Sequence, residues 1–238
     1  MKYPRRLRIS TILLILVTCG EVLSAQDVTA TGRVKLIGHH NDAAGVVVWL
    51  SPIDGASVAV ADNSHRRLRL VQKDKRFEPH LLVVPVGSAV EFPNLDPWFH
   101  NVFSLFEGKR FDLGLYEAGS SRTVRFDKAG VSYIFCNIHP EMSAIVVAVP
   151  TPYYAISDRK GDVNIRNVPP GRYVLHFWQE YVPAKDLEIL TREVEVSGPS
   201  FSFGTIELQE RVSLHMSHKD KYGQEYPATE PANPIYSR

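Results

Sequence analysis

Three side chains that can bind a metal ion lie close together in the segment FCNIHPEM, residues 135–142. Cys136, His139 and Met142 follow one another at intervals of three residues. The chain contains only two cysteines and three methionines in 238 residues, so sulfur donors are scarce elsewhere. A strand that ends in a tight loop can direct all three side chains toward one centre. We therefore interpret this segment as part of a metal site.

His100, in the segment PNLDPWFHNVFS, is our candidate for the fourth ligand, and it also follows a strand-like run. Two imidazoles, one thiolate and a weak thioether are the ligands of a mononuclear blue copper centre. The sulfur ligands favour Cu(I), whereas the imidazoles hold Cu(II). A scaffold that fixes His100, Cys136, His139 and Met142 would let an electron arrive or leave with little movement.

Zinc is the main competing metal, because it also binds Cys and His. Thioether is not among its usual ligands, so Met142 favours copper, provided that Met142 is a ligand. The structural alternative is that Met142 fills space in the core and that Cys136 is a small buried hydrophobic residue. The order and spacing of the four residue types favour the metal site.

The first 25 residues resemble an export signal. Four basic residues within the first eight positions precede the apolar run ILLILV, residues 12–17, which is too short to span a bilayer. The segment LSA, residues 23–25, is a suitable cleavage site. We expect a periplasmic or secreted protein, without lipoprotein anchoring at Cys19, because Thr18 is a poor residue before a modified cysteine.

Removal of residues 1–25 changes both the charge and the cysteine content. It takes away four Lys or Arg residues and one Glu, so the formal net charge falls from +1 to −2. Nothing in this charge indicates nucleic-acid binding. Cys136 then remains as the single thiol and cannot form an internal disulfide, which is a further indication of a buried or metal-bound cysteine.

The elements that must position these ligands read as strands. Short runs rich in Val, Ile, Phe and Tyr alternate with Gly and Pro turns, a pattern typical of β-sandwiches. The only helical turns that we consider lie around Phe106 to Tyr116, and we expect no longer helix. Residues 212–238 are polar and predict a mobile tail, in which we interpret His215 and His218 as solvated.

Residues 66–150 resemble a cupredoxin of the plastocyanin and amicyanin branch. The resemblance rests on FEPHLLVVPVGSAVEFPNLDPWFHNVFS (residues 77–104), on VRFDKAGVSYIFCNIHPEM (residues 124–142) and on the short Cys-x-x-His-x-x-Met spacing. It implies a Greek-key sandwich with one copper ion near one end. It implies His100, Cys136 and His139 as equatorial ligands and Met142 as the long axial ligand.

The same resemblance implies roles for the neighbouring residues. Asn101 matches the residue that ties the two ligand-bearing loops together by hydrogen bonding, and Pro140 stiffens the loop after His139. His139 matches the partly exposed ligand through which electrons pass. An apolar docking patch for a redox partner would then surround this port, formed by Pro97, Trp98, Phe99, Pro140 and Met142. The alternative for Trp98 and Phe99 is core packing.

The remaining strands resemble a carboxypeptidase regulatory-like sandwich of the transthyretin type. The resemblance rests on TGRVKLIGHHNDAAGVVVWLSP (residues 31–52) and AISDRKGDVNIRNVPPGRYVLHFW (residues 155–178). Each piece is half a sandwich, so we expect residues 26–65 and 151–211 to form one discontinuous domain with the cupredoxin inserted. The alternative is two tandem sandwiches. Domains of this type commonly act as binding modules or as spacers, and this one would contact a membrane complex or a carbohydrate.

These observations predict an all-β protein, with a cupredoxin sandwich and a second small β-sandwich. We expect an exported copper protein that carries single electrons between transient redox protein partners. A site with four protein ligands leaves no open position for substrate, so we do not expect an enzyme. The alternatives are a copper-binding or copper-delivery protein and a binding module without a redox role.

Overall fold

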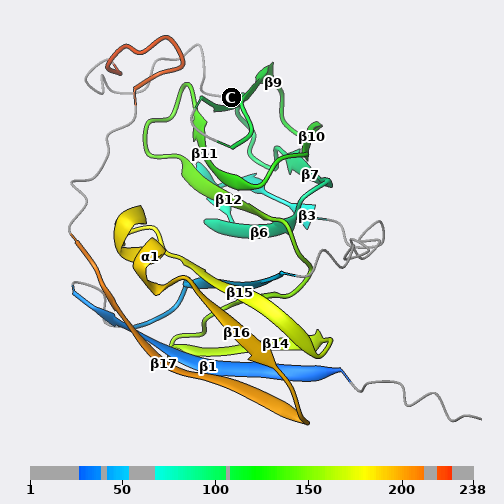
Figure 1. The fold of residues 1–238 in the computed structure, drawn as a ribbon. Coiled ribbons are helices and arrows are strands. Elements are labelled where there is room, and N and C mark those ends of the chain that lie inside the picture. Colours follow the sequence, from blue (N-terminus) through cyan, green and yellow to red (C-terminus); the bar gives the residue numbers. More distant parts are fainter. Residues whose placement is uncertain (1–26, 39–41, 54–67, 106–107, 212–218, 227–238) are drawn as a thin grey trace, which may run out of the picture.

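A computed structural model describes residues 27–38, 42–53, 68–105, 108–211 and 219–226. The expected export segment, Cys19, His215 and His218 lie outside the described residues. The protein is almost entirely β-structure, as predicted, and it forms two stacked β-sandwiches (Figure 1). In the part of the chain that is described, no helix has the length and apolar character needed to cross a membrane.

The central sandwich comprises residues 68–149. Its strands are β3 (Leu68–Arg69), β4 (Val71–Lys73), β5 (Arg76–Glu78), β6 (Leu81–Pro85), β7 (Ser88–Pro93), β8 (His100–Ser104), β9 (Phe111–Tyr116), β10 (Ser121–Phe126), β11 (Gly130–Cys136) and β12 (Ser143–Val149). One sheet has the order β10-β7-β3, the facing sheet has the order β6-β12-β11-β8-β9, and β4 and β5 form a hairpin. A single apolar core lies between the sheets and includes Cys136 and Met142.

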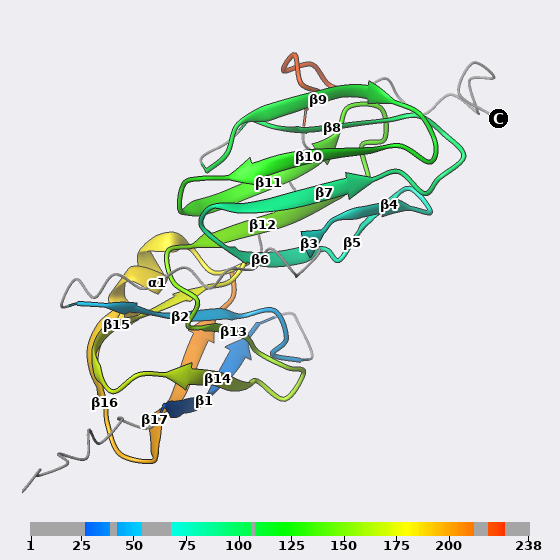
Figure 2. The same ribbon diagram turned by 90° about the vertical axis from the view of Figure 1, so that its right-hand side faces the viewer.

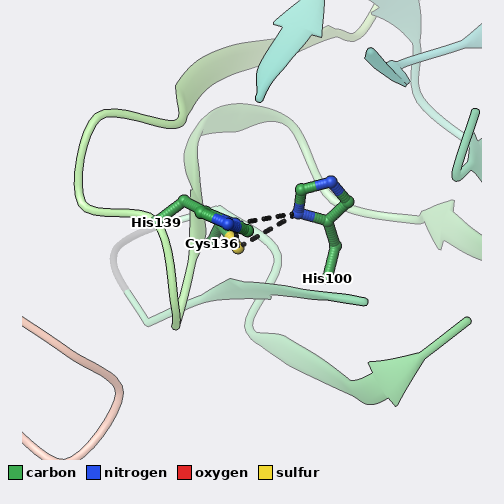
Figure 3. Close-up of side chains that lie close together, drawn as sticks. All are labelled: His100, Cys136 and His139. Carbon is green, nitrogen blue, oxygen red and sulfur yellow. Dashed lines mark hydrogen bonds between the residues drawn. The ribbon is translucent and has the colours of Figure 1, made fainter. Parts of the chain in front are cut away.

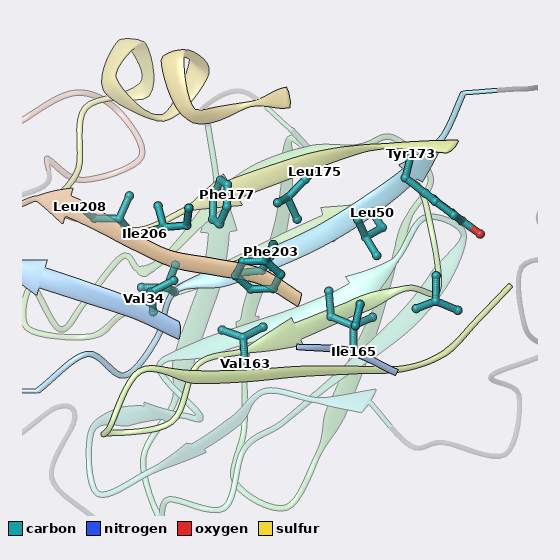
Figure 4. Packing of buried hydrophobic residues seen from close by; sticks show 14 of the residues in the cluster. Val34, Leu50, Val163, Ile165, Tyr173, Leu175, Phe177, Phe203, Ile206 and Leu208 are labelled. Atoms are coloured by element: carbon teal, nitrogen blue, oxygen red, sulfur yellow. The ribbon is translucent and has the colours of Figure 1, made fainter. Parts of the chain in front are cut away.

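The outer sandwich combines strands from both sides of the central one. Its strands are β1 (Val28–Ile37), β2 (Val47–Pro52), β13 (Tyr154–Ile156), β14 (Asp162–Val168), β15 (Gly171–Trp178), β16 (Arg192–Val196) and β17 (Ser200–Gln209). The sheets have the orders β14-β1-β17 and β13-β2-β15-β16. Side chains from both sheets, such as Leu50, Leu175 and Phe203, fill the core between them (Figure 4).

Strand pairing shows how the two parts of the outer sandwich meet. Strand β2 pairs antiparallel with β15, with Leu50 opposite Leu175, and β1 pairs with both β14 and β17. Neither part covers its own core, because each sheet needs strands from before and after the central sandwich. The chain therefore leaves the outer sandwich after β2 and returns to it at β13.

Strand β12 explains the run of apolar residues AIVVAV in the sequence. A strand with one face in water alternates apolar and polar residues, whereas a strand covered on both faces reads as a continuous apolar run. Ala144, Val146 and Ala148 pack in the core of the central sandwich. Ile145, Val147 and Val149 form a second cluster with Val47 of the outer sandwich. The two sandwiches are thus joined by a buried apolar seam, and Figure 2 shows them stacked.

Two local expectations differ from the structure. Residues 111–116 form strand β9 at the edge of the larger sheet, where the sequence suggested helical turns. A short helix, α1 (Ala184–Leu190), instead follows Pro183 in the outer sandwich. Its sequence AKDLEIL contains good helix formers, and Leu187 is its one buried residue. With so little apolar periodicity, this helix depends on its packing against β15.

Residues 158–161 form an Asp-x-x-Gly turn. The amide of Gly161 donates to the carbonyl of Asp158 at 2.9 Å, and the Asp158 carboxylate accepts from the amides of Lys160 and Asp162. Gly161 has a φ of +80°, and a Cβ atom there would lie 1.9 Å from the carbonyl oxygen of Val34. Glycine is needed at this position for both reasons.

Candidate metal centre

Strand pairing brings the two ligand-bearing segments to the same end of the larger sheet. His100 begins β8 and Cys136 ends β11, and these strands pair with Cys136 opposite Val102. The amide of Asn137 donates to the carbonyl of Asn101 at 3.2 Å and continues this pairing past the strand. The side chains of His100 and Cys136 therefore meet although they are far apart in the sequence.

The loop between β11 and β12 returns His139 to the same place. The amide of Met142 donates to the carbonyl of His139 at 3.0 Å, and the amide of Cys136 donates to the carbonyl of Met142 at 3.2 Å. These bonds close a tight turn, in which Cys136 and His139 face inward, as Figure 3 shows. We refer to residues 137–142 as the ligand loop.

Three donor atoms form a small triangle. The Nδ1 atoms of His100 and His139 lie 3.1 Å apart, and the Sγ atom of Cys136 lies 3.7 Å from the first and 3.6 Å from the second. Metal–ligand bonds of about 2.0–2.3 Å place such atoms about 3.1–3.8 Å apart at ordinary bond angles. The triangle thus has the size that one metal ion requires.

Met142 is the expected fourth ligand. It is fully buried and belongs to the same apolar cluster as Cys136. Thiolate, two imidazoles and a nearby thioether fit a type 1 copper site better than a structural zinc site, which uses no thioether. The four residues predicted from the sequence are therefore all at this end of the central sandwich, and they fit such a site.

Asp96, which the sequence analysis did not single out, fixes the tautomer of His100. Its carboxylate accepts a hydrogen bond from Nε2 of His100 at 2.8 Å, and both side chains are buried. It also accepts from the amides of Asp74 and Lys75, at the turn between β4 and β5. A carboxylate can only accept, so the proton of His100 lies on Nε2 and the lone pair of Nδ1 points into the triangle.

The pKa values of these groups follow from burial and from their hydrogen bonds. Burial alone would raise the pKa of Asp96, but hydrogen bonds from the Lys75 amide, His100 and the Asp74 amide hold it below its usual value. Burial lowers the pKa of His100, although Asp96 opposes the change. Burial, together with the neighbouring His100, lowers the pKa of His139 to about 4. Both imidazoles are therefore neutral at pH 7, as metal ligands must be.

Cys136 is a protonated thiol in the protein without metal. Burial raises its pKa, and the backbone amides of Asn101, Ile138 and His139 oppose this by hydrogen bonding to the sulfur. The same amides would stabilise a thiolate once a cation replaces the proton. The electrostatic surroundings thus disfavour a free anion but suit a metal-bound one.

Asn101 connects the two ligand-bearing segments through its main chain. Its carbonyl accepts from the amide of Asn137, whereas its side-chain amide donates to Asp112 on β9 at 2.6 Å. The side chain itself therefore ties His100's strand to the sheet edge rather than to the ligand loop. Pro140 is exposed on the ligand loop, and its expected effect on the metal stays a prediction.

The proposed docking residues lie at the surface or partly so. Pro97 is exposed, 46% of Phe99 is exposed, and Trp98 is half-buried with the Lys75 ammonium 5.0 Å from its ring centroid. Neither aromatic residue is a core residue. Leu95, in the same loop, is also exposed, whereas Met142, which was expected to contribute to this surface, is fully buried. We call Leu95, Pro97, Trp98 and Phe99 the apolar patch.

Part of the expected mobile tail has a defined place. Residues 219–226 form a turn, in which the Asp220 carboxylate accepts from the amides of Tyr222 and Gln224. Lys221 and Tyr226 from this segment contact the ligand loop and its neighbours. Composition predicted a polar segment correctly, but it could not reveal these specific contacts.

Comparisons with known proteins give partial structural similarity. No protein-family model matches the chain, and a search of curated proteins finds no match. A purple cupredoxin from Nitrosopumilus maritimus is 23% identical, with a TM-score of 0.32, over 34% of this chain and 99% of its own. Amicyanin from Paracoccus versutus is 22% identical, with a TM-score of 0.33, over 39% of this chain and 90% of its own.

A copper-containing nitrite reductase from Thermus scotoductus SA-01 is also similar to part of the chain. It is 24% identical, with a TM-score of 0.34, over 35% of this chain and 22% of its own length. Each of these three similarities covers less than half of the present chain.

Proposed function

We propose that this chain is an exported type 1 copper protein that carries single electrons between redox partners. The observation that carries the proposal is the triangle of His100 Nδ1, His139 Nδ1 and Cys136 Sγ, which already has the size of a metal site. Copper held by these donors would supply reversible one-electron chemistry. The protein's own contribution is to fix the donors before and after the electron moves.

The burial of the ligands supports electron transfer over catalysis. His100, Cys136 and Met142 are fully buried, and His139 alone is partly exposed. A substrate would need a free position beside the ligands, whereas an electron needs only a short path to the surface. The ring of His139 offers that path.

The apolar patch supports brief contact with a redox protein. Its members precede His100 in one loop, so they lie at the ligand end of the sandwich. Redox encounters use small interfaces, which form and separate quickly. An export segment at residues 1–25 would put this exchange outside the cytoplasm.

The proposal is tested by loading the purified protein with Cu(II). We expect an intense visible thiolate-to-copper band, a type 1 electron-paramagnetic spectrum and a reversible one-electron couple. A Cys136→Ser variant should lose the band and keep its fold by circular dichroism. His176→Gln is the matched control, because His176 stacks on Trp49 in the outer sandwich and should leave the band unchanged.

Two results would contradict the electron-carrier proposal. Colour that persists in Cys136→Ser would show that the ligand assignment is wrong. Binding of Cu(II) without a charge-transfer band and without a reversible couple would favour the copper-delivery or simple binding alternatives. Rapid transfer of copper to a chelator, with no electron exchange, would point specifically to delivery.

A further inference from the structure

The segment of residues 219–226 returns to the metal end of the molecule after the outer sandwich is complete. In Figures 1 and 2 it lies at the end of the central sandwich that is far from the outer one. It is a folded turn, since the carbonyl of Asp220 accepts from the Gly223 amide at 3.0 Å and the Asp220 amide donates to the Gln224 carbonyl at 2.9 Å. A preformed turn can hold its side chains in fixed positions.

Three hydrogen bonds from this segment converge on the ligand loop and its support. The hydroxyl of Tyr226 donates to the carbonyl of Cys136 at 2.8 Å. The amide of Lys221 donates to Oδ1 of Asn137 at 2.9 Å, and its ammonium pairs with Asp112 at 2.8 Å. Asp112 in turn accepts from the side chain of Asn101, the neighbour of His100. Both ligand-bearing segments are thus linked to one distant piece of chain.

These bonds hold the residues at which the ligand loop begins. A loop of six residues between two strands can open while the sheets stay intact, because only its own turn bonds resist the motion. Cys136 is fully buried, so its sulfur becomes accessible only when such an opening occurs. Bonds to the Cys136 carbonyl and to Asn137 must break in any opening that moves these two residues.

We propose that residues 219–226 form a strap that locks the ligand loop closed, with Tyr226 as the positioning residue for Cys136. The proposal rests on the proposed metal site, but it concerns the protein's own chain. The strap slows both the exposure of the Cys136 thiol in the metal-free protein and the escape of metal from the loaded protein. It acts by raising the cost of opening and not by contributing a ligand.

The test is the rate at which the Cys136 thiol of the full, metal-free chain reacts with an aromatic disulfide reagent. In Tyr226→Phe the ring is kept and one hydrogen bond is lost, so we expect the rate to rise about two- to tenfold. Lys221→Met, which removes the ion pair with Asp112, should raise the rate in the same direction. Tyr153→Phe is the control, because Tyr153 packs on Tyr173 in the outer sandwich and should leave the rate unchanged.

Two further measurements separate a local brace from a general loss of stability. Amide hydrogen exchange in Tyr226→Phe should accelerate in residues 137–142 and stay unchanged in the β10-β7-β3 sheet. The dissociation rate of copper into excess chelator should rise by the same factor as the thiol reaction. Equal thiol rates and equal loop exchange in the wild type and both strap variants would overturn the proposal.

Failure of the proposed function would be seen separately. A protein that binds copper without a thiolate band would refute the electron carrier, yet the thiol and exchange measurements would still decide the strap. Conversely, a blue protein with strap variants indistinguishable from the wild type would refute the strap alone. If Tyr226→Phe does not fold, Lys221→Met provides the same comparison.

Discussion

Replacing Asp96 with Asn should weaken metal binding and destabilise the fold at the same time. The carboxylate is buried and accepts three hydrogen bonds, from Nε2 of His100 and from the amides of Asp74 and Lys75. The amide of Asn has nearly the same shape but only one acceptor oxygen. Its NH₂ group must therefore either face one of the backbone amides, which also donate, or point its own hydrogen at Nε2 of His100.

The size of both effects follows from this change. Hydrogen bonds to a charged group contribute about 1.5–3 kcal/mol, so the metal-free Asp96→Asn variant should lose about that much free energy of unfolding. When the NH₂ group donates to Nε2 of His100, the ring proton moves to Nδ1 and occupies the lone pair that a metal needs. Removal of such a partner typically lowers metal affinity about 10–100-fold, and we expect this range.

The assay combines denaturant unfolding of the metal-free protein with competition against a copper chelator at pH 7. Asp127→Asn is the matched control, because Asp127 pairs with Lys109 at the surface and should change neither measurement. If Asp96→Asn bound copper as tightly as the wild type, the carboxylate would not set the tautomer of His100. The reasoning about how the site is prepared would then be refuted, even if stability fell.

Three further predictions concern the scaffold. Glu180→Gln should lower the melting temperature mainly at pH 5–6. Hydrogen bonding to Glu180 raises the pKa of His80, so their 2.9 Å contact stabilises the fold below the usual His pKa, and this stabilisation is lost as pH rises through the raised pKa. A difference in melting temperature that grows toward pH 8.5 would contradict this prediction. Val147→Ala should lower the free energy of unfolding, measured with denaturant, by about 1.5–3 kcal/mol, because Val147 is 2% exposed in the apolar seam between the sandwiches. An unchanged free energy of unfolding would show that the sandwiches are not packed together. Gly161→Ala should lower the free energy of unfolding by at least about 1–3 kcal/mol from the positive φ alone, and the clash with the Val34 carbonyl should add to this loss. An unchanged melting temperature would exclude the turn at residues 158–161.

The ligands themselves were accessible from sequence because three of them share one short loop. Cys136, His139 and Met142 are unusual residue types at close spacing, so chemistry and sequence distance agree. His100 was a candidate because it follows a strand-like run, but the pairing of β8 with β11 that brings it to the loop cannot be read from spacing. The all-β fold was accessible for a similar reason, because alternating and continuous apolar runs report directly on which strand faces are covered.

The supporting residues were not accessible in this way. Asp96 stands in the segment NLDP, where an aspartate is expected simply as a turn residue, although its position four residues before His100 was a usable signal. Lys221 and Tyr226 lie in a polar, proline-bearing segment, whose composition is the same whether it is docked or solvated. Strand β9 was misjudged because its pattern FDLGLY is ambiguous, and its pairing with β8 decides its conformation.

The protonation state of the three donor side chains has a consequence for metal uptake. The two imidazoles are already neutral at pH 7, whereas the sulfur still holds hydrogen. Loading the site near neutrality must therefore release a single H⁺ to the buffer, that of the thiol. Above neutral pH, the apparent affinity should rise about tenfold for each pH unit until the sulfur ionises unaided, because each bound ion displaces one proton.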